Sequence, residues 1–248
     1  MKEKKYLVAK KLIIIKGNLI KNGEQIMRIY LKTTQNSQTV PFPYQQNLTG
    51  VLNKWLGAEN TEHGKISMYS FSSLRGSKIA DGGLNFQHGA SWFISFADEM
   101  KIRKIVASIL ADPEMFCGMK VIDVDIEETP DMSKRELFFA ASPIFIKRSF
   151  PEKHEDRHYT YEDAESNSLL RETLLNKMRL CSIPVDDTFE ISFDISYNKK
   201  KIKLVSYRNI KNKTSVCPVI IKGKPETKTF AWNVGIGNCT GIGFGAIY

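Results

Sequence analysis

The sequence predicts an α+β fold built from two tandem ferredoxin-like domains, each with the element order β-α-β-β-α-β. Strand-like and helical patterns alternate in that order through the first half of the chain. A similar order recurs in the second half, after a polar stretch around Pro130. The two halves share no obvious sequence repeat, so the predicted duplication rests on element order alone.

The first half contains two amphipathic helical segments. Apolar residues at helical spacing before Gly57 predict the first helix: Leu48, Val51, Leu52, Trp55 and Leu56. The second helix carries its apolar residues on one face: Ile102, Ile105, Val106, Ile109 and Leu110. Strands are expected at residues 26–33, 66–74, 90–96 and 120–128, and the stretch 75–83 is rich in turn-forming residues.

The second half is expected to follow a comparable order. A strand at 137–148 precedes a helix at 164–181, whose apolar stripe contains Leu170, Leu174 and Met178. Strands at 189–197 and 201–207 are expected to pair with each other. A short helix at 226–234 and a last strand at 243–248 complete the prediction.

These patterns place an N-terminal domain at residues 27–130 and a C-terminal domain at 131–248. Residues 1–26 precede what is already a complete first strand, and Met27 would make a natural start for that strand. We interpret residues 1–26 as an appendage, either an extra hairpin or an over-long gene start.

The chain of 248 residues has a formal net charge of +9, which favours a polyanionic partner, either nucleic acid or an anionic membrane surface. The early apolar run at 12–15 is flanked by lysines and is far too short to span a membrane. The four cysteines form no CxxC pair: Cys117, Cys181, Cys217 and Cys239. They indicate reduced thiols in a cytoplasmic protein, with neither a zinc site nor a disulfide framework.

Glycine is concentrated at the end of the chain, in GIGNCTGIGFGAIY at 235–248. Glycine is costly in ordered structure, so such a cluster indicates that something comes close to the main chain, most commonly a phosphate. No GKS or GKT follows, and no long helix follows either, which excludes the P-loop and the dinucleotide fingerprint. A tight hairpin before an edge strand is the alternative reading.

His63 is the histidine best placed for chemistry, because it lies between the first helix and a strand, with Lys65 nearby. An imidazole can transfer a proton near neutral pH, and an ammonium can stabilise negative charge on phosphorus in a transition state. His154 and His158 could bind a metal only if their stretch were helical, and their surroundings favour a solvated loop. His88 is expected in a turn or at the surface.

Basic residues cluster in the second half. Either they form a solvated rim, or they form a track for a phosphate backbone. The cluster contains Lys199, Lys200, Lys201, Lys203, Arg208, Lys211, Lys213, Lys222, Lys224 and Lys228. Aromatic residues are interleaved with it and could stack on bases: Tyr197, Tyr207 and Phe244.

Together, these residues resemble the CRISPR-associated repeat-cleaving endoribonucleases, the Cas-six type of the repeat-associated RNA-binding superfamily. The tail at 235–248 resembles the family's C-terminal glycine-rich loop, with its GFG ending. The segment 43–56 resembles the first-helix signature, and HGKISMYSFSSL at 63–74 resembles the histidine followed by an aromatic-serine strand. The segment 140–148 is similar to the strand that opens the family's second half. The likeness runs from Met27 to Tyr248 in matching order.

The resemblance implies a metal-independent endoribonuclease that cleaves CRISPR repeat RNA and needs no cofactor. In that reaction the ribose 2′-OH attacks the adjacent phosphate and leaves a 2′,3′-cyclic phosphate and a 5′-OH. His63 would be the general acid or base, and Lys65, not clearly in register with the family's lysine, the charge stabiliser. Asn53 stands where some members have a tyrosine, so the second proton-transfer group is open among Tyr44, Tyr69 and Ser67.

The resemblance of the tail and the clustered charge together give the residues expected to bind RNA: Gly235, Gly237, Gly241, Gly243, Phe244, Gly245, Lys199, Lys200, Lys201 and Arg208. A catalytically silent RNA-binding subunit of a CRISPR effector complex is the alternative. A basic ferredoxin-like protein with an unrelated anionic partner is a third reading, which leaves the GFG ending unexplained. Association with subunits of the interference complex and formation of a homodimer stay open.

Overall fold

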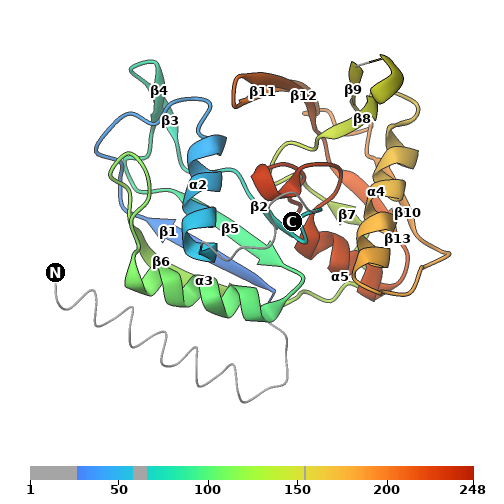
Figure 1. Ribbon diagram of the computed structural model, residues 1–248, viewed down its shortest axis with the longest axis horizontal. Helices are drawn as coiled ribbons and strands as arrows, with labels where there is room; N and C mark the ends of the chain where they lie inside the picture. Colours follow the sequence, from blue (N-terminus) through green and yellow to red (C-terminus); the bar gives the residue numbers. More distant parts are fainter. Residues whose placement is uncertain (1–26, 58–65, 154) are drawn as a thin grey trace. The chain divides into compact units, whose positions relative to one another are not determined.

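The computed structural model describes residues 27–57, 66–153 and 155–248. These residues fall into two compact units (Figure 1). One contains 27–57 and 74–129, and the other contains 66–73 and 130–248. The fold is α+β, as predicted, with helices and antiparallel sheets in both units. The predicted appendage at 1–26 lies outside the described residues.

The first unit is organised around a central strand, β1 (Arg28–Thr33), which pairs antiparallel with β5 (Ser91–Phe96) and with β6 (Val121–Glu127). Side chains alternate between the two faces of a strand, so Ile29 and Leu31 point to the same face. Both are completely buried. They form the base of a core that two helices complete.

The two predicted helices of this unit are present as α2 (Gln45–Leu56) and α3 (Glu99–Ala111). α2 presents its apolar face to β5, where Trp55 stacks on Trp92 with ring centroids 6.1 Å apart. The side chain of Asp98 begins α3 by accepting a hydrogen bond from the amide of Met100. The periodicity of the sequence therefore predicts both helices correctly.

The stretch at 75–83, expected only to contain turns, forms part of a β-hairpin of β3 (Lys78–Ala80) and β4 (Gly83–Asn85). Asp81 and Gly82 both have positive φ in the connecting turn. An Asp-Gly pair is a typical two-residue hairpin turn, so the turn prediction was right and the flanking strands were missed.

The second unit contains β2 (Tyr69–Phe71) and a sheet in the order β10-β13-β7. The strands of this sheet are β10 (Glu190–Phe193), β13 (Val219–Lys222) and β7 (Leu137–Phe138). Its helices are α4 (Ser166–Leu180) and α5 (Pro225–Val234), close to their predicted positions. Trp232 on α5 is buried, as are Trp55 and Trp92 in the first unit, each with 1% of its surface exposed.

Two hairpins project from this unit (Figure 1). β8 (Ile146–Phe150) pairs with β9 (Glu155–Tyr159), and a 3₁₀ turn at Pro151–Lys153 lies between them. β11 (Lys201–Tyr207) pairs with β12 (Ile210–Val216). The predicted pairing of 189–197 with 201–207 is therefore wrong, because β10 pairs with β13 and β11 with β12.

Two predicted strands of this unit are also wrong in part. The expected strand at 137–148 is interrupted between β7 and β8, where Pro143 has no amide hydrogen to offer a neighbouring strand. The expected last strand at 243–248 makes a single bridge, Ala140 with Ile247, because positive φ at Gly243 and Gly245 interrupts the extended backbone. Within the described residues, no helix combines the length and apolar character needed to cross a bilayer.

Candidate nucleic-acid interface

The candidate catalytic residues are only partly described. His63 and Lys65 lie outside the described residues. Tyr44 belongs to the first unit, immediately before α2, and its half-buried hydroxyl accepts a hydrogen bond from the amide of Leu74 at 3.1 Å. Tyr69 belongs to the second unit, on β2, where it is 4% exposed and its hydroxyl donates to the carbonyl oxygen of Gly241 at 3.2 Å. Tyr69 thus contacts the glycine-rich loop from inside the unit.

The glycine-rich loop (235–245) begins where α5 ends, and most of it is buried. The main chain of the loop packs against main chain of its own unit. Gly245 has φ +67°, and a Cβ there would overlap the carbonyl oxygen of Ile236. A Cβ at Gly241 would overlap the hydroxyl of Ser67. These glycines are therefore required by the fold, whatever role the loop has toward RNA.

Phe244, which the sequence suggested as a base-stacking residue, lies in the core of the second unit. Its side chain is completely buried and packs with Phe145 and Val205, with the two phenyl centroids 5.2 Å apart. A base could reach this ring only if the core opened. Tyr197 and Tyr207 are partly exposed, with the ring of Tyr197 edge to face against Phe139 and the guanidinium of Arg208 over the ring of Tyr207.

Lys177 on α4 is a buried cation in contact with the glycine-rich loop, and no pattern in the sequence points to it. It is 2% exposed, and its Nζ donates hydrogen bonds to the carbonyl oxygen of Val234 at 3.1 Å and to Oγ1 of Thr240 at 3.0 Å. Burial lowers the pKa of Lys177 to about 7, and the nearby thiols of Cys239 and Cys181 oppose this effect only partly.

Part of the basic cluster of the sequence forms a basic ribbon, the β11–β12 hairpin together with Lys199 and Lys200. The other three lysines of the cluster lie outside it: Lys222 on β13, Lys224 just before α5, and Lys228 buried on α5. Lys201 and Lys203 lie on one face of the hairpin, and Lys211 and Lys213 lie on the other, because side chains alternate along each strand. Arg208 occupies the turn. Residues 199–216 contain no Asp or Glu, so the hairpin is positively charged on both faces. Such a surface attracts a phosphate backbone.

The second hairpin corrects the prediction for the histidine-rich stretch. His158 lies in β9 and not in a solvated loop. Its Nδ1 accepts a hydrogen bond from the amide of Lys213 at 3.3 Å, and its ring meets Phe145 edge to face. His154 lies outside the described residues. Among the residues that the structure describes, no group of three His, Cys, Asp or Glu side chains could hold a metal ion.

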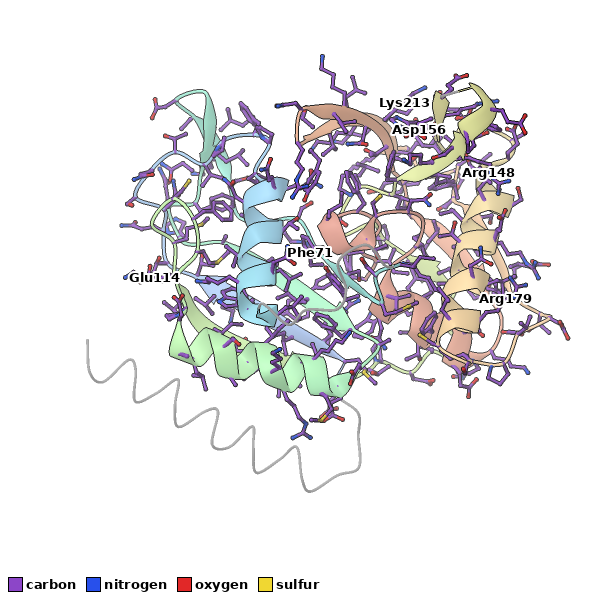
Figure 2. The ribbon with its side chains drawn as sticks, in the orientation of Figure 1. Phe71, Glu114, Arg148, Asp156, Arg179 and Lys213 are labelled. Carbon is purple, nitrogen blue, oxygen red and sulfur yellow. The ribbon has the colours of Figure 1, made fainter. Side chains whose placement is uncertain are left out.

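Figure 2 shows the side chains of the hairpins of the second unit, with Lys213 and Asp156 labelled near each other. Asp156 pairs with Lys147 at 2.8 Å on β8. The cations of β8–β9 are thus partly neutralised, since Arg148 likewise pairs with Glu172. The basic ribbon has no carboxylate of its own, and it is the more strongly positive hairpin.

Comparison with known proteins relates the second half of the chain to a family of CRISPR-associated proteins. Residues 127–248 match the family model described as CRISPR associated protein Cas6, C-terminal. The resemblance of this chain to that family, which the sequence motifs predicted, is therefore confirmed. A search of the curated proteins finds no match.

Several solved structures share the fold. One described as "CRISPR associated protein Cas6" is 20% identical, with a TM-score of 0.76 over 90% of this chain and 98% of that one. "Characterization of a Cas6-related gene from Pyrococcus furiosus" is 22% identical, with a TM-score of 0.78 over 90% and 98%. "An RAMP protein binding different RNA substrates" is 23% identical, with a TM-score of 0.77 over 89% and 98%.

Proposed function

Because residues 127–248 belong to the Cas6 family, we propose that the protein is an endoribonuclease that cleaves CRISPR repeat RNA in the precursor transcript. The observation that carries the proposal is this family match, since it includes the glycine-rich loop and the basic ribbon. The tandem ferredoxin-like arrangement of domains 27–130 and 131–248 belongs to the same proposal. So do a cytoplasmic location and association with interference-complex subunits or with a second copy of the chain.

The proposed reaction needs no metal ion. A general base takes the proton from the ribose 2′-OH, and the new O2′–P bond forms as the P–O5′ bond breaks. A general acid gives a proton to the departing O5′, so the products carry a 2′,3′-cyclic phosphate and a 5′-OH. His63 is proposed as one of these groups, and Lys65 as the cation that stabilises the charge on phosphorus.

The basic ribbon and the glycine-rich loop are proposed to bind the substrate. The ribbon supplies cations for the phosphates, through Lys199, Lys200, Lys201 and Arg208. The loop is proposed to supply a fixed backbone surface, through Gly235, Gly237, Gly241, Gly243 and Gly245. Phe244 supports this surface from below, as its burial in the core indicates.

The second proton-transfer group is open among Tyr44, Tyr69 and Ser67. The hydroxyl of Tyr44 already accepts a hydrogen bond from a backbone amide, and that of Tyr69 donates to a backbone carbonyl. Each would have to exchange this contact for one with RNA. Tyr44→Phe, Tyr69→Phe and Ser67→Ala, assayed separately for single-turnover cleavage, identify which hydroxyl the reaction uses.

The decisive experiment is to incubate the protein with the repeat RNA of its own genome in excess EDTA and to map the product ends. We expect one cut per repeat, with a 2′,3′-cyclic phosphate and a 5′-OH. His63→Ala should abolish cleavage and keep most of the binding. Loss of cleavage in EDTA would contradict the metal-free mechanism.

A catalytically silent RNA-binding subunit is the second candidate function. Asn53 lies on α2 at the position where some relatives are expected to carry a tyrosine. Because an asparagine cannot replace the phenol of a tyrosine in proton transfer, this difference favours the catalytically silent function. Wild-type protein that binds repeat RNA and never cuts it would establish this alternative.

A further inference from the structure

Lys177 occupies a position on α4 where an apolar residue would be expected. The buried face of this helix also contains Leu170, Leu174 and Met178, each no more than 1% exposed. Lysine is almost never fully buried unless its charge is compensated, because the ammonium loses its hydration. The compensation at Lys177 is therefore a specific feature of the site.

The ammonium of Lys177 has three N–H donors and meets three oxygen acceptors. These are the carbonyl oxygens of Val234 at 3.1 Å and Gly235 at 3.5 Å, and Oγ1 of Thr240 at 3.0 Å. Val234 is the last residue of α5, where carbonyl groups lack partners within the helix and the helix dipole is negative. A cation at this point satisfies those carbonyls.

These acceptors lie on two segments of the chain that are joined by residues 236–239. Val234 and Gly235 form the end of α5, and Thr240 begins the 3₁₀ turn Thr240–Ile242. Lys177 therefore ties the start of the glycine-rich loop to its middle. Its three contacts bridge the residues on either side of 236–239.

The segment 67–70 contacts the same loop and the end of α5. The hydroxyl of Tyr69 donates to the carbonyl oxygen of Gly241 at 3.2 Å, and Ser70 Oγ donates to the carbonyl oxygen of Asn233 at 3.0 Å. Thr240 Oγ1 lies 3.5 Å from the carbonyl oxygen of Ser67 and donates to it. The 3₁₀ turn is thus held between α4 and the segment that leads into β2.

We propose that Lys177 is a positioning residue of the glycine-rich loop, whose ammonium group ties the end of α5 to the 3₁₀ turn and so sets the loop shape that RNA meets. The part that concerns RNA rests on the proposed function. Burial brings the pKa of Lys177 down to about 7, and the titratable groups that interact with it are the thiols of Cys181, directly after α4, and of Cys239 in the loop. Loss of one N–H as the pH rises removes one of the three contacts.

Lys177→Met tests the proposal, because methionine keeps an unbranched chain and removes all three donors. Lys228→Met is the matched control. Lys228 is also 2% exposed in this unit, but its Nζ donates to the carbonyl oxygen of Ser133 and not to the loop. Thr240→Val, which removes one acceptor and keeps the shape, replaces Lys177→Met if that variant does not fold.

The first measurement is hydrogen–deuterium exchange of the free protein. We expect amides of the loop, such as those of Asn238 and Gly245, to exchange on the order of tenfold faster in Lys177→Met than in wild type. In Lys228→Met the loop amides should keep the wild-type rate. Equal acceleration in both variants, or no acceleration in Lys177→Met, would overturn the proposal without any reference to RNA.

The second measurement is the affinity for repeat RNA at pH 6, 7 and 8. Lys177→Met should weaken binding about tenfold at pH 6, equivalent to about 1.4 kcal/mol. The advantage of wild type over the variant should shrink as the pH rises through about 7, the pKa of Lys177. A ratio of wild-type to variant affinity that stays the same from pH 6 to pH 8 would contradict a positioning role for the ammonium. Absence of RNA binding by the wild type would instead refute the proposed function, and the exchange result would still decide the role of Lys177 in the loop.

Discussion

The backbone amide of Lys213 donates a hydrogen bond to Nδ1 of His158 over 3.3 Å, and this bond attaches β12 to β9 through an imidazole ring. Nδ1 can accept only when it carries no proton, so the histidine must be neutral with its proton on Nε2. Burial lowers the pKa of His158, while the carboxylate of Asp156 opposes this effect and the ammonium of Lys147 adds to it. The two hairpins of the second unit therefore share a pH-sensitive contact.

Acidification should loosen this contact. Because the pKa of His158 is lower in the folded protein than its ordinary value near 6.5, the unfolded chain binds more protons and stability falls as the pH drops below about 6.5. His158→Asn keeps an acceptor that does not titrate. Between pH 7 and pH 5, its Tm should fall roughly 2 °C less than that of the wild type. His88→Asn, at an exposed turn, is the control, and equal losses in wild type and both variants would contradict this assignment.

Substitution of loop glycines should act first on stability. Gly245→Ala combines a positive φ with an overlap against the carbonyl oxygen of Ile236, and we expect it to lower the free energy of unfolding by about 2–4 kcal/mol. Gly50→Ala is the matched control, because Gly50 lies exposed in α2 with nothing within 4 Å of the added Cβ. It should stabilise the protein by about 0.5–1 kcal/mol.

Denaturant unfolding of the two glycine variants gives this comparison directly. A Gly245→Ala protein as stable as wild type would show that the loop can move away from Ile236. Because the resemblance places Gly243 and Gly245 among the RNA-binding residues, Gly243→Val and Gly245→Val are expected to weaken RNA binding. Any such loss must be compared with the loss of stability in the same protein.

Neutralising the basic ribbon should change the salt dependence of RNA binding. If Lys201 and Lys203 each contact a phosphate of single-stranded RNA, Lys201→Gln with Lys203→Gln should reduce the slope of log K against log salt by about 1.4. Lys222→Gln removes a lysine of the same unit that pairs with Glu190 outside the hairpin, and it should leave the slope unchanged. Titrations from low to physiological salt measure both slopes, and equal slopes would assign the phosphate contacts elsewhere.

The helices and several strands could be predicted from the sequence because their signals are local. The apolar stripes of α2, α3 and α4 repeat at helical spacing, and α5 begins at Pro225 and ends before Gly235. The partners of the strands were harder to predict. β10 pairs with β13, about 30 residues further along the chain, and no local pattern distinguishes that partner from the adjacent β11.

The candidate site was predictable only where charge or glycine marked it. The basic ribbon was visible because its cations lie close together in the sequence with no Asp or Glu among them, although its turn at Arg208 and Asn209 contains neither glycine nor proline. The glycine cluster was visible, but a sequence cannot show whether a backbone approaches RNA or its own fold. Lys177 gave no signal, because a lysine on an amphipathic helix is ordinarily exposed.

The burial of all three tryptophans determines what an optical experiment on this protein can see. Trp55 and Trp92 are stacked in one unit, and Trp232 is alone on α5 in the other. Their native emission should be blue-shifted and insensitive to ligands that touch only surface hairpins, so titrations need a labelled oligonucleotide. In variants that keep a single tryptophan, its fluorescence would report the unfolding of one unit at a time.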